Sequence, residues 1–466
     1  MKVTLKFLGG AKTVTGSRYL LEIDHQKILI DCGLFQGLKE YRLRNWESFP
    51  INPSEIDVVL LTHAHIDHTG YLPKLVKEGF SGDIFCTFPT EELTRILLLD
   101  SGKLQEEEAA YAQKKGYSRH EKPQPLYTIE DAEKVFPLLR PVDMEKEIVL
   151  NERISFKYFN AGHILGAAIL KVIVKGDNQE KKIVFSGDLG RYFDPIMNPP
   201  SRVPFADVLV MESTYGNRKQ PDPKPEEELG RAIRDTYRNG GVAIIPAFAV
   251  GRTQLILYYL HLLQQKGRIP DIPIYVDSPM AIDVTKLYKR YTPYHRLGPV
   301  IEEDDFNPFY FKNLHYYQSQ EASVSLNTVK GNAIIISASG MATGGRILHH
   351  LYHRLPNEQD SIIFVGYQAE GTRGRRLIDG EETSKMYGVE VPVKANIYYI
   401  EGLSAHADQE ELIDWAEGFI SKPKMTFLVH GEKEASETLA YKLQEELHWH
   451  PIVPEYLESF VLFDGI

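Results

Sequence analysis

The chain has 466 residues and a formal net charge of −11, from 53 basic and 64 acidic side chains. Hydrophobic residues make up 43% and charged residues 25%, a mixture typical of folded proteins that excludes a disordered or fibrous class. The length suits about two or three domains, and the acidic balance argues against indiscriminate nucleic-acid binding while leaving room for a local basic site.

Cysteine content and hydropathy bear on the cellular compartment. The two cysteines, Cys32 and Cys86, cannot form a disulfide framework, which predicts a reducing environment. Residues 1–10 alternate apolar and polar side chains, a strand pattern that differs from the unbroken apolar core of a signal peptide. No run approaches ~18 apolar residues. We therefore expect a cytoplasmic protein without a membrane partner.

Short apolar runs rich in β-branched residues predict strands along the whole chain. In chain order they cover residues 27–31, 56–62, 153–160, 181–188, 207–213, 241–248, 273–278, 332–339, 361–367, 396–402 and 425–431. Helical patterns follow several of these runs, at residues 70–79, 90–115, 252–267 and 409–420. This alternation of strands and helices predicts an α/β protein.

The middle of the chain differs in charge from its flanks. Residues 211–395 carry 22 basic and 21 acidic side chains, whereas the remainder carries 31 basic and 43 acidic ones. Three strands of this middle part end in loops of small residues. We interpret it as an inserted α/β module within a more acidic outer domain, entered through a solvated linker at residues 217–228.

The strongest local signal is the segment 62–70, which carries three histidines and one aspartate within six residues. It lies where a predicted buried strand ends and a helix begins, the position at which open α/β sheets build their sites. Alternate residues of an extended turn face the same way, so we expect His63 and His65 to bind one ion while Asp67 and His68 point toward a second. These donors favour zinc or a similar metal. An ordinary polar surface turn, the competing interpretation, leaves several donors at one strand end unexplained.

One segment cannot complete two coordination spheres, so further ligands must come from elsewhere in the chain. The candidates are ligand-type residues at or just past the ends of predicted strands, namely Asp31, His163, Asp188, Glu212, His406 and His430. A carboxylate such as Asp188 can bridge two cations with its two oxygens. Taken singly, each candidate is more readily explained as a core histidine whose hydrogen bonds are satisfied or as an ordinary loop carboxylate. Their shared placement at strand ends is what indicates a dinuclear metal site.

These motifs resemble those of a known superfamily. The His-x-His-x-Asp-His signature at residues 63–68 resembles the metallo-β-lactamase superfamily. Within it, Glu212, His406 and His430 match the three extra motifs of the β-CASP nucleases. That branch includes the endonuclease subunit of the cleavage and polyadenylation specificity factor and its bacterial relatives. The resemblance runs through essentially the whole chain.

The resemblance implies an architecture. A four-layer αββα metallo-β-lactamase domain would be formed by residues 1–208 together with residues 396–466. An α/β β-CASP domain, residues 209–395, would be inserted between these parts and cap the active site.

The resemblance also implies two zinc ions per chain, with manganese as the alternative. The ligands of the first zinc would be three histidines, His63, His65 and His163. The ligands of the second would be Asp67, His68 and His430. Asp188 would bridge both ions.

Three further residues receive roles around the ligands. Asp31 would orient ligand imidazoles from behind. His406, paired with Glu212, would be the general acid, and Asp67 belongs with them to the catalytic group as well as to the ligands.

Such a site suits phosphodiester hydrolysis. Two divalent ions about 3.5–4 Å apart can acidify a bridging water, and the resulting hydroxide attacks phosphorus. The departing oxygen takes a proton from His406, whose pKa Glu212 would raise. Products carry a 5′-phosphate and a 3′-hydroxyl. We expect endonucleolytic cleavage, and a 5′-to-3′ exonuclease activity stays open beside it.

The inserted module offers candidate contacts to single-stranded RNA. Strand ends and helix starts, whose N–H groups favour phosphate, carry Arg252, Ser337, Ser339, Arg346 and Arg373, and Tyr367 could stack on a base. The same glycines and arginines also fit plain tight turns and solvated charges. By family analogy, His430 favours RNA over DNA. Whether the protein forms a homo-oligomer stays open.

Two other functions compete with a ribonuclease. A small-molecule metallo-hydrolase of the lactonase or thioesterase type uses the same metal scaffold, but it would not need the large insertion or His406. A non-catalytic RNA-binding subunit would be expected to have lost metal ligands, whereas all of the expected ligands are present here.

Overall fold

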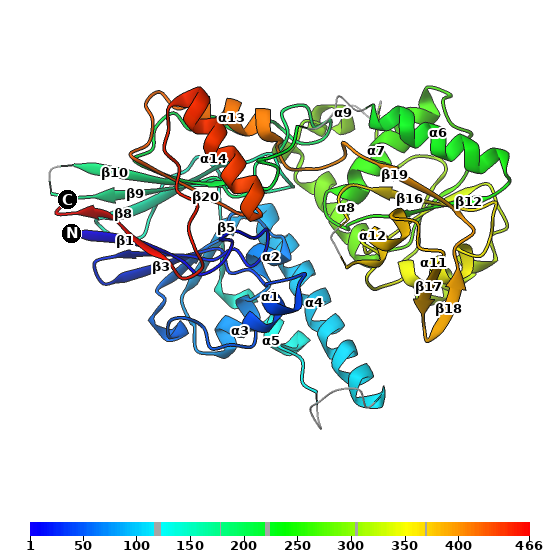
Figure 1. Cartoon of the computed structure of the whole chain (residues 1–466), viewed down its shortest axis with the longest axis horizontal. Coiled ribbons are helices and arrows are strands. Elements are labelled where there is room, and N and C mark those ends of the chain that lie inside the picture. The colour runs from blue at the N-terminus through cyan, green and yellow to red at the C-terminus, as the bar shows by residue number, and fades with distance from the viewer. Residues whose placement is uncertain (116–122, 178, 220–223, 303–305, 369–370) are drawn as a thin grey trace. The chain divides into compact units, whose positions relative to one another are not determined.

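The computed structural model of the chain describes residues 1–466 except 116–122, 178, 220–223, 303–305 and 369–370 (Figure 1). The chain forms two compact units. The discontinuous unit contains residues 1–219 and 406–466, and the inserted unit contains residues 220–405. Part of the expected linker, residues 220–223, lies outside the described residues. No helix among the described residues is long and apolar enough to cross a membrane.

Two mixed sheets form the centre of the discontinuous unit. The first has the order β21 (Ser459–Asp464), β1 (Lys2–Phe7), β2 (Tyr19–Ile23), β3 (Gln26–Ile30), β4 (Val58–Leu60), β5 (Asp83–Thr87) and β6 (Leu139–Val142). The second has the order β20 (Met425–Val429), β11 (Val208–Glu212), β10 (Glu180–Phe185), β9 (Ala168–Lys175), β8 (Ile154–Asn160) and β7 (Ile148–Val149). Strands β3 to β6 run parallel in the first sheet, as do β10, β11 and β20 in the second. Their carboxyl ends therefore share an edge in each sheet.

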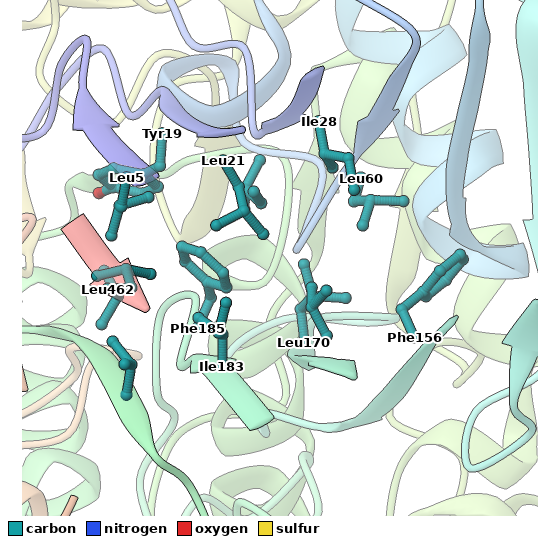
Figure 2. Packing of buried hydrophobic residues seen from close by; sticks show 14 of the residues in the cluster. Leu5, Tyr19, Leu21, Ile28, Leu60, Phe156, Leu170, Ile183, Phe185 and Leu462 are labelled. Carbon is teal, nitrogen blue, oxygen red and sulfur yellow. The ribbon is translucent and has the colours of Figure 1, made fainter. Parts of the chain in front are cut away.

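The two sheets pack face to face over an apolar core. Alternation along the strands puts every second side chain into this layer, as the burial of Val3, Leu5 and Phe7 in β1 illustrates. Figure 2 shows Leu5 and Leu21 of the first sheet in the same packed layer as Phe185 of the second. The sandwich holds the strand ends, and hence the loops that follow them, in fixed positions.

Helices cover the outer faces of both sheets. Those of the first part of the unit are α1 (Lys39–Arg44), α2 (Ile66–Thr69), α3 (Leu72–Lys77), α4 (Phe88–Lys115) and α5 (Ile129–Glu133), with short 3-10 turns at Pro53–Glu55 and Phe136–Leu138. Leu72, Leu98 and Ala132 pack from α3, α4 and α5 onto the first sheet. Beside β20 lie α13 (Gln409–Glu417) and α14 (Lys433–Leu447) (Figure 1). The order helix, sheet, sheet, helix confirms the predicted αββα architecture.

The inserted unit is built on one parallel sheet. Its order is β14 (Leu314–Tyr316), β13 (Ile274–Val276), β15 (Ala333–Ser337), β12 (Val242–Pro246), β16 (Ser361–Val365) and β19 (Asn396–Ile400), beside a hairpin of β17 (Thr383–Met386) and β18 (Val389–Pro392). Its helices are α6 (Pro225–Arg238), α7 (Arg252–Gln265), α8 (Pro279–Arg290), α9 (Gly298–Glu302), α10 (Gln320–Ser325), α11 (Ile347–Arg354) and α12 (Arg373–Ile378), with 3-10 turns at Thr292–Tyr294 and Leu326–Thr328. Strands β12, β15 and β16 are buried throughout, as parallel strands covered on both faces must be.

The units divide later in the chain than residues 208/209 and 395/396, the boundaries expected from sequence. Strand β11 pairs with β10 and β20 and so belongs to the discontinuous unit. Strand β19 pairs with β16 along five residues and so belongs to the inserted unit. Sheet pairing, which the local sequence does not reveal, decides both cases.

Candidate metal centre

The candidate ligands lie at the carboxyl ends of strands in the discontinuous unit. Strand β4 leads into the segment with His63, His65, Asp67 and His68. The other strand ends supply Asp31 after β3, His163 after β8, Asp188 after β10, Glu212 at the end of β11 and His430 after β20. Asp31 and His430, which lie far apart in the sequence, therefore meet at one edge.

Three histidines and one aspartate form the first group of converging ligand atoms. The Nε2 atoms of His63 and His163 lie 3.1 and 3.2 Å from Nδ1 of His65. Oδ2 of Asp188 lies 3.4 Å from His63 Nε2 and 3.7 Å from His163 Nε2. All four ligand atoms lie within 4.8 Å of one another, close enough to hold a single metal ion.

Asp67, His68 and His430 form a second group of the same kind. Oδ2 of Asp67 lies 3.7 Å from Nε2 of His430 and 4.0 Å from Nε2 of His68. Asp188 faces this group as well, with Oδ1 at 3.4 Å from His68 Nε2 and Oδ2 at 3.6 Å from His430 Nε2. Asp188 is thus the carboxylate common to both groups.

Two observations test whether these residues fit a metal. His68 Nε2 and Asp188 Oδ1 are buried, face each other and have no hydrogen-bond partner. Orphaned polar atoms of this kind are costly unless a bound group satisfies them. Burial and the neighbouring imidazoles also lower the pKa of His63 and His430 well below the usual range, which keeps both rings neutral, the ligating form. The residues therefore fit a metal cofactor.

Asp31 braces the histidine segment from behind. Its Oδ1 accepts the Thr62 N–H at 2.7 Å, and its Oδ2 accepts the Thr62 hydroxyl and His68 Nδ1–H, both at 2.8 Å. The last contact directs His68 Nε2 toward Asp188. Asp31 adopts a left-handed backbone conformation, with φ of +57°, a strained state that tends to persist at functional sites.

His430 is held at both its backbone and its ring. Its φ of +48° also lies in the left-handed region. Its N–H donates to the Gly10 carbonyl at 2.6 Å, and its Nδ1 lies 2.8 Å from the Ser17 hydroxyl. The sequence analysis overlooked Ser17, because a serine in the first inter-strand loop carries no ligand signature.

His406 and Glu212 lie beside the metal ligands. His406 Nδ1 is 3.3 Å from both carboxylate oxygens of Glu212, which is fully buried and also accepts the Leu189 N–H. His406 Nε2 lies 4.0 Å from Asp188 Oδ2, and the ring is 20% exposed. Burial lowers the pKa of His406, but the carboxylates around it, Glu212 first and then Asp188 and Asp67, together raise the pKa to about 9. The raised pKa favours the protonated imidazole, the form that can donate a proton.

The start of α13 positions the loop that carries His406. Asp408 and Glu411 form a capping box, in which each side chain accepts the backbone N–H of the other residue. Glu411 also accepts the Tyr192 N–H and pairs with Arg191 in the loop after Asp188. One carboxylate thus links the segment that follows Asp188 to the one that follows His406.

The expected RNA contacts lie together in the inserted unit, at the carboxyl ends of β12, β15 and β16. They are Arg252, Ser337, Ser339, Arg346, Tyr367 and Arg373. Several are engaged within their own unit. Ser337 is buried and its hydroxyl donates to the Asp277 carbonyl, and the hydroxyl of the half-buried Ser339 lies 3.0 Å from that of Thr343.

The arginines of this set have different surroundings. Arg346 donates to Asp277 Oδ1 at 2.7 Å and to two backbone carbonyls. Arg373 donates to the carbonyls of Ala342 and Lys385. Arg252 lies over Gly366, where an added Cβ would come within 3.0 Å of the guanidinium.

Comparison with known proteins agrees with this geometry. The family descriptions that match are a metallo-beta-lactamase superfamily domain at residues 20–201, a Beta-Casp domain at 253–377 and a Zn-dependent metallo-hydrolase RNA specificity domain at 390–454. The chain is 38% identical to "Ribonuclease TTHA0252" of Thermus thermophilus, over 91% of this chain and 92% of that protein. The chain belongs to the β-CASP branch of the metallo-β-lactamase superfamily.

Other relatives of this β-CASP protein differ in length and name. An "RNase J-like protein" of Methanocaldococcus jannaschii is 32% identical over 97% of this chain and 98% of its own. "Transcription termination factor FttA" of Methanosarcina mazei is 33% identical over 96% of this chain and 69% of its own. A solved protein of unknown function from Enterococcus faecalis V583 shares the fold, with a TM-score of 0.56 over 99% of this chain at 14% identity.

Proposed function

We propose that this protein is a zinc-dependent ribonuclease that hydrolyses phosphodiester bonds of single-stranded RNA and leaves a 5′-phosphate and a 3′-hydroxyl. The observation that carries the proposal is Asp188, one buried carboxylate that faces two groups of candidate ligand atoms, with Nε2 of His406 at 4.0 Å from its Oδ2. Endonucleolytic cleavage is the main mode proposed, with 5′-to-3′ trimming as a second mode. The relatives named as ribonucleases support the substrate class.

The metal ligands follow from the two groups. The first zinc would be held by His63, His65 and His163, and the second by Asp67, His68 and His430, with Asp188 shared between them. Two bound divalent ions would acidify a water, orient the phosphodiester and neutralise the charge that develops during in-line displacement. Nitrogen-rich ligands favour zinc, and manganese is the alternative at the group that contains Asp67.

Proton transfer is assigned to the chain's own side chains. Glu212 holds His406 through Nδ1, so that Nε2–H is the donor available to the leaving 3′-oxygen. The His406 side chain is 20% exposed and so accessible to a substrate, whereas the Glu212 side chain is fully buried and inaccessible to solvent. The partly exposed Asp67 carboxylate is placed to accept a proton from the attacking water. Asp31 acts through His68, whose ring it orients.

Single-stranded RNA is the proposed partner, and the match to an RNA specificity domain supports RNA over DNA. Phosphates would contact the strand-end loops of the inserted unit at Arg252, Ser337, Ser339, Arg346 and Arg373, and a base would stack on Tyr367. We keep the cytoplasm as the proposed location, since both cysteines are free and buried. Homo-oligomerisation remains to be measured.

The decisive experiment compares cleavage of one RNA sequence and the matching DNA, labelled in turn at each end. Wild type should cut RNA, and the ladder of fragments separates internal cutting from stepwise trimming. His406→Ala should retain two metals per chain but cut roughly 10²–10⁴-fold more slowly, the usual contribution of general acid–base catalysis. His25→Ala, at an exposed turn between β2 and β3, is the matched control and should behave as wild type.

Two results would contradict the proposal. Absence of cleavage by a protein that holds two metals per chain would favour a small-molecule substrate. Absence of bound metal would favour a non-catalytic RNA-binding subunit.

A further inference from the structure

The loop between β1 and β2, residues 8–18, lies against the second group of metal ligands. Its Ser17 is fully buried and makes three hydrogen-bond contacts, two of them with residues of that group. The Ser17 N–H donates to the carbonyl of Asp67 at 2.9 Å, and its carbonyl accepts the Gly33 N–H. Its hydroxyl lies 2.8 Å from His430 Nδ1. Ser17 thus touches two of the three ligands in this group, at the backbone of one and the ring of the other.

The side-chain contact matters because a histidine ligand must present an unprotonated nitrogen. His430 Nε2 is the atom that faces Asp67 and Asp188, at 3.7 and 3.6 Å. A neutral ring has one proton, so Nε2 is available only when the proton is on Nδ1. Ser17 Oγ can hold it there by accepting the Nδ1–H. The partner of the other ring nitrogen commonly sets the tautomer and basicity of a histidine ligand.

The Tyr19 hydroxyl can accept a hydrogen bond from the Ser17 hydroxyl. The Tyr19 and Ser17 hydroxyls both lie beside Gly10, since a Cβ added there would be 2.5 Å from one and 3.1 Å from the other. Burial raises the pKa of Tyr19, and a hydrogen bond with Ser17 offsets part of this rise. When Ser17 donates to Tyr19, its lone pairs remain free to accept from His430.

Gly10 completes the arrangement at the backbone. Its carbonyl accepts the His430 N–H at 2.6 Å, and its own φ of +64° is one that glycine adopts without strain. The left-handed backbone of His430 is therefore fixed by Gly10 while the ring is fixed by Ser17. Asp31 performs the corresponding task for His68, through Nδ1.

We propose that Ser17 is a positioning residue for the second metal, holding His430 in the tautomer and orientation that allow Nε2 to bind. The inference rests on the proposed function, which assigns His430 to a metal, and it adds the residue that prepares this ligand. Ser17 itself touches neither metal nor substrate.

Metal affinity of the full chain tests the proposal without relying on activity. Zinc is titrated against a chelator, and wild type is compared with Ser17→Ala. One of the two zinc ions, the one assigned to the second group, should lose about 10–100-fold in affinity, the usual effect of removing a partner behind a ligand, while the other zinc is retained. Cobalt-loaded protein supplies a spectroscopic readout, because the visible absorption of Co²⁺ changes with its coordination.

The matched control is Thr15→Val, which removes another buried hydroxyl from the same loop. Thr15 donates to the Leu34 carbonyl and accepts the Gln36 N–H, so it contacts no candidate ligand. It should lose stability while both zinc ions stay bound as in wild type. If Ser17→Ala does not fold, Tyr19→Phe decides instead, since it deprives Ser17 of its acceptor and should also weaken the second zinc.

Unchanged zinc affinity and an unchanged cobalt spectrum in the deciding variant would overturn the proposal. An equal loss of affinity in Thr15→Val would overturn it too, because the effect would then belong to the loop as a whole. Wild type that binds two metals but cuts no RNA would refute the proposed ribonuclease and leave the role of Ser17 to the affinity data.

Discussion

The carboxyl strand edges of the two units use their charged side chains in opposite ways. In the discontinuous unit, ligand atoms of seven residues converge, and atoms such as Asp188 Oδ1 are left without a hydrogen-bond partner. In the inserted unit, the buried Asp277 accepts from Arg346, His350 and Ser323, each at 2.7 Å. At the first edge, buried polar atoms lack hydrogen-bond partners that a bound cation could replace. At the second edge, the buried carboxylate of Asp277 has hydrogen-bond donors from its own unit. The two buried carboxylates thus differ in use: Asp188 faces two groups of candidate metal ligands, whereas Asp277 is satisfied by side chains of its own unit.

Removing the shared carboxylate should have the largest effect. Asp188→Ala takes away the one side chain that faces both ligand groups. We expect loss of both metals and a fall in RNA cleavage of roughly 10⁴-fold or more, since several kcal/mol of charge stabilisation disappear. Elemental analysis and cleavage rates check this. Asp177→Ala, which removes a largely exposed carboxylate of the same unit, should change neither quantity.

Glu212→Gln should shift the pH dependence of cleavage. Glu212 is the first of the carboxylates that raise the pKa of His406 to about 9, so neutralising Glu212 should lower this pKa. Because only the protonated ring donates, the fall in cleavage rate on the alkaline side should begin at a lower pH in the variant. Above the new pKa of His406, the rate should fall about tenfold for each pH unit. Rate profiles between pH 6 and 10 test this against the exposed Glu55→Gln. An alkaline limb that does not move would remove Glu212 from this role.

Asp277→Asn should destabilise the inserted unit and spare the metals. Burial would raise the pKa of Asp277, but hydrogen bonds from His350, Ser323 and Arg346 lower it below the ordinary value. Its ionised form therefore stabilises the fold above about pH 4, and this contribution disappears as the pH falls through the lowered pKa. The variant should lose about 1–3 kcal/mol at neutral pH and show less acid sensitivity.

Hydrogen exchange of β15 and α11 at several pH values measures that change locally, with metal content determined in parallel. Loss of metal from Asp277→Asn, with stability unchanged, would reverse the contrast between the two edges.

Arg252→Ala should give the smallest effect, one confined to RNA affinity. The wild-type side chain lies over Gly366 at the end of β16, where a phosphate contact is proposed. We expect weaker binding and a salt dependence reduced by about one unit of slope. Filter binding at several salt concentrations measures both, with the exposed Arg238→Ala as control. Equal affinity in the two variants would exclude the contact.

Much of the fold was predictable from local patterns. Apolar β-branched runs predicted strands such as β3, β4 and β8, and the long helical pattern at residues 90–115 corresponds to α4. Other strands, among them β2, β5, β9 and β21, were not predicted. The domain limits were less accessible, because the assignment of β11 and β19 depends on which strands they pair with. Hydrophobic periodicity reports burial and carries no information about the partner strand.

The metal motif shows what the sequence by itself determined. His63, His65, Asp67 and His68 lie within six residues, so their chemistry and spacing are visible without a fold. The distant candidate ligands were predicted from their donor atoms and their places at strand ends, and the structure brings their atoms together. Arg346, by contrast, was predicted as a phosphate contact or a solvated charge, and its hydrogen bond to Asp277, 69 residues away, is visible only in the folded sheet.

Tertiary structure alone decided how the ligands are prepared. Ser17 and His430 are 413 residues apart, and they meet because β1 and β20 belong to sheets that pack on each other. A hydroxyl has no metal-ligand signature, so nothing in the local sequence distinguishes Ser17 from other buried serines. The sequence determined which side chains have atoms that can bind a metal. The fold determined which of these atoms point toward a common centre and which ring nitrogen carries the proton, because hydrogen-bond partners depend on proximity in space.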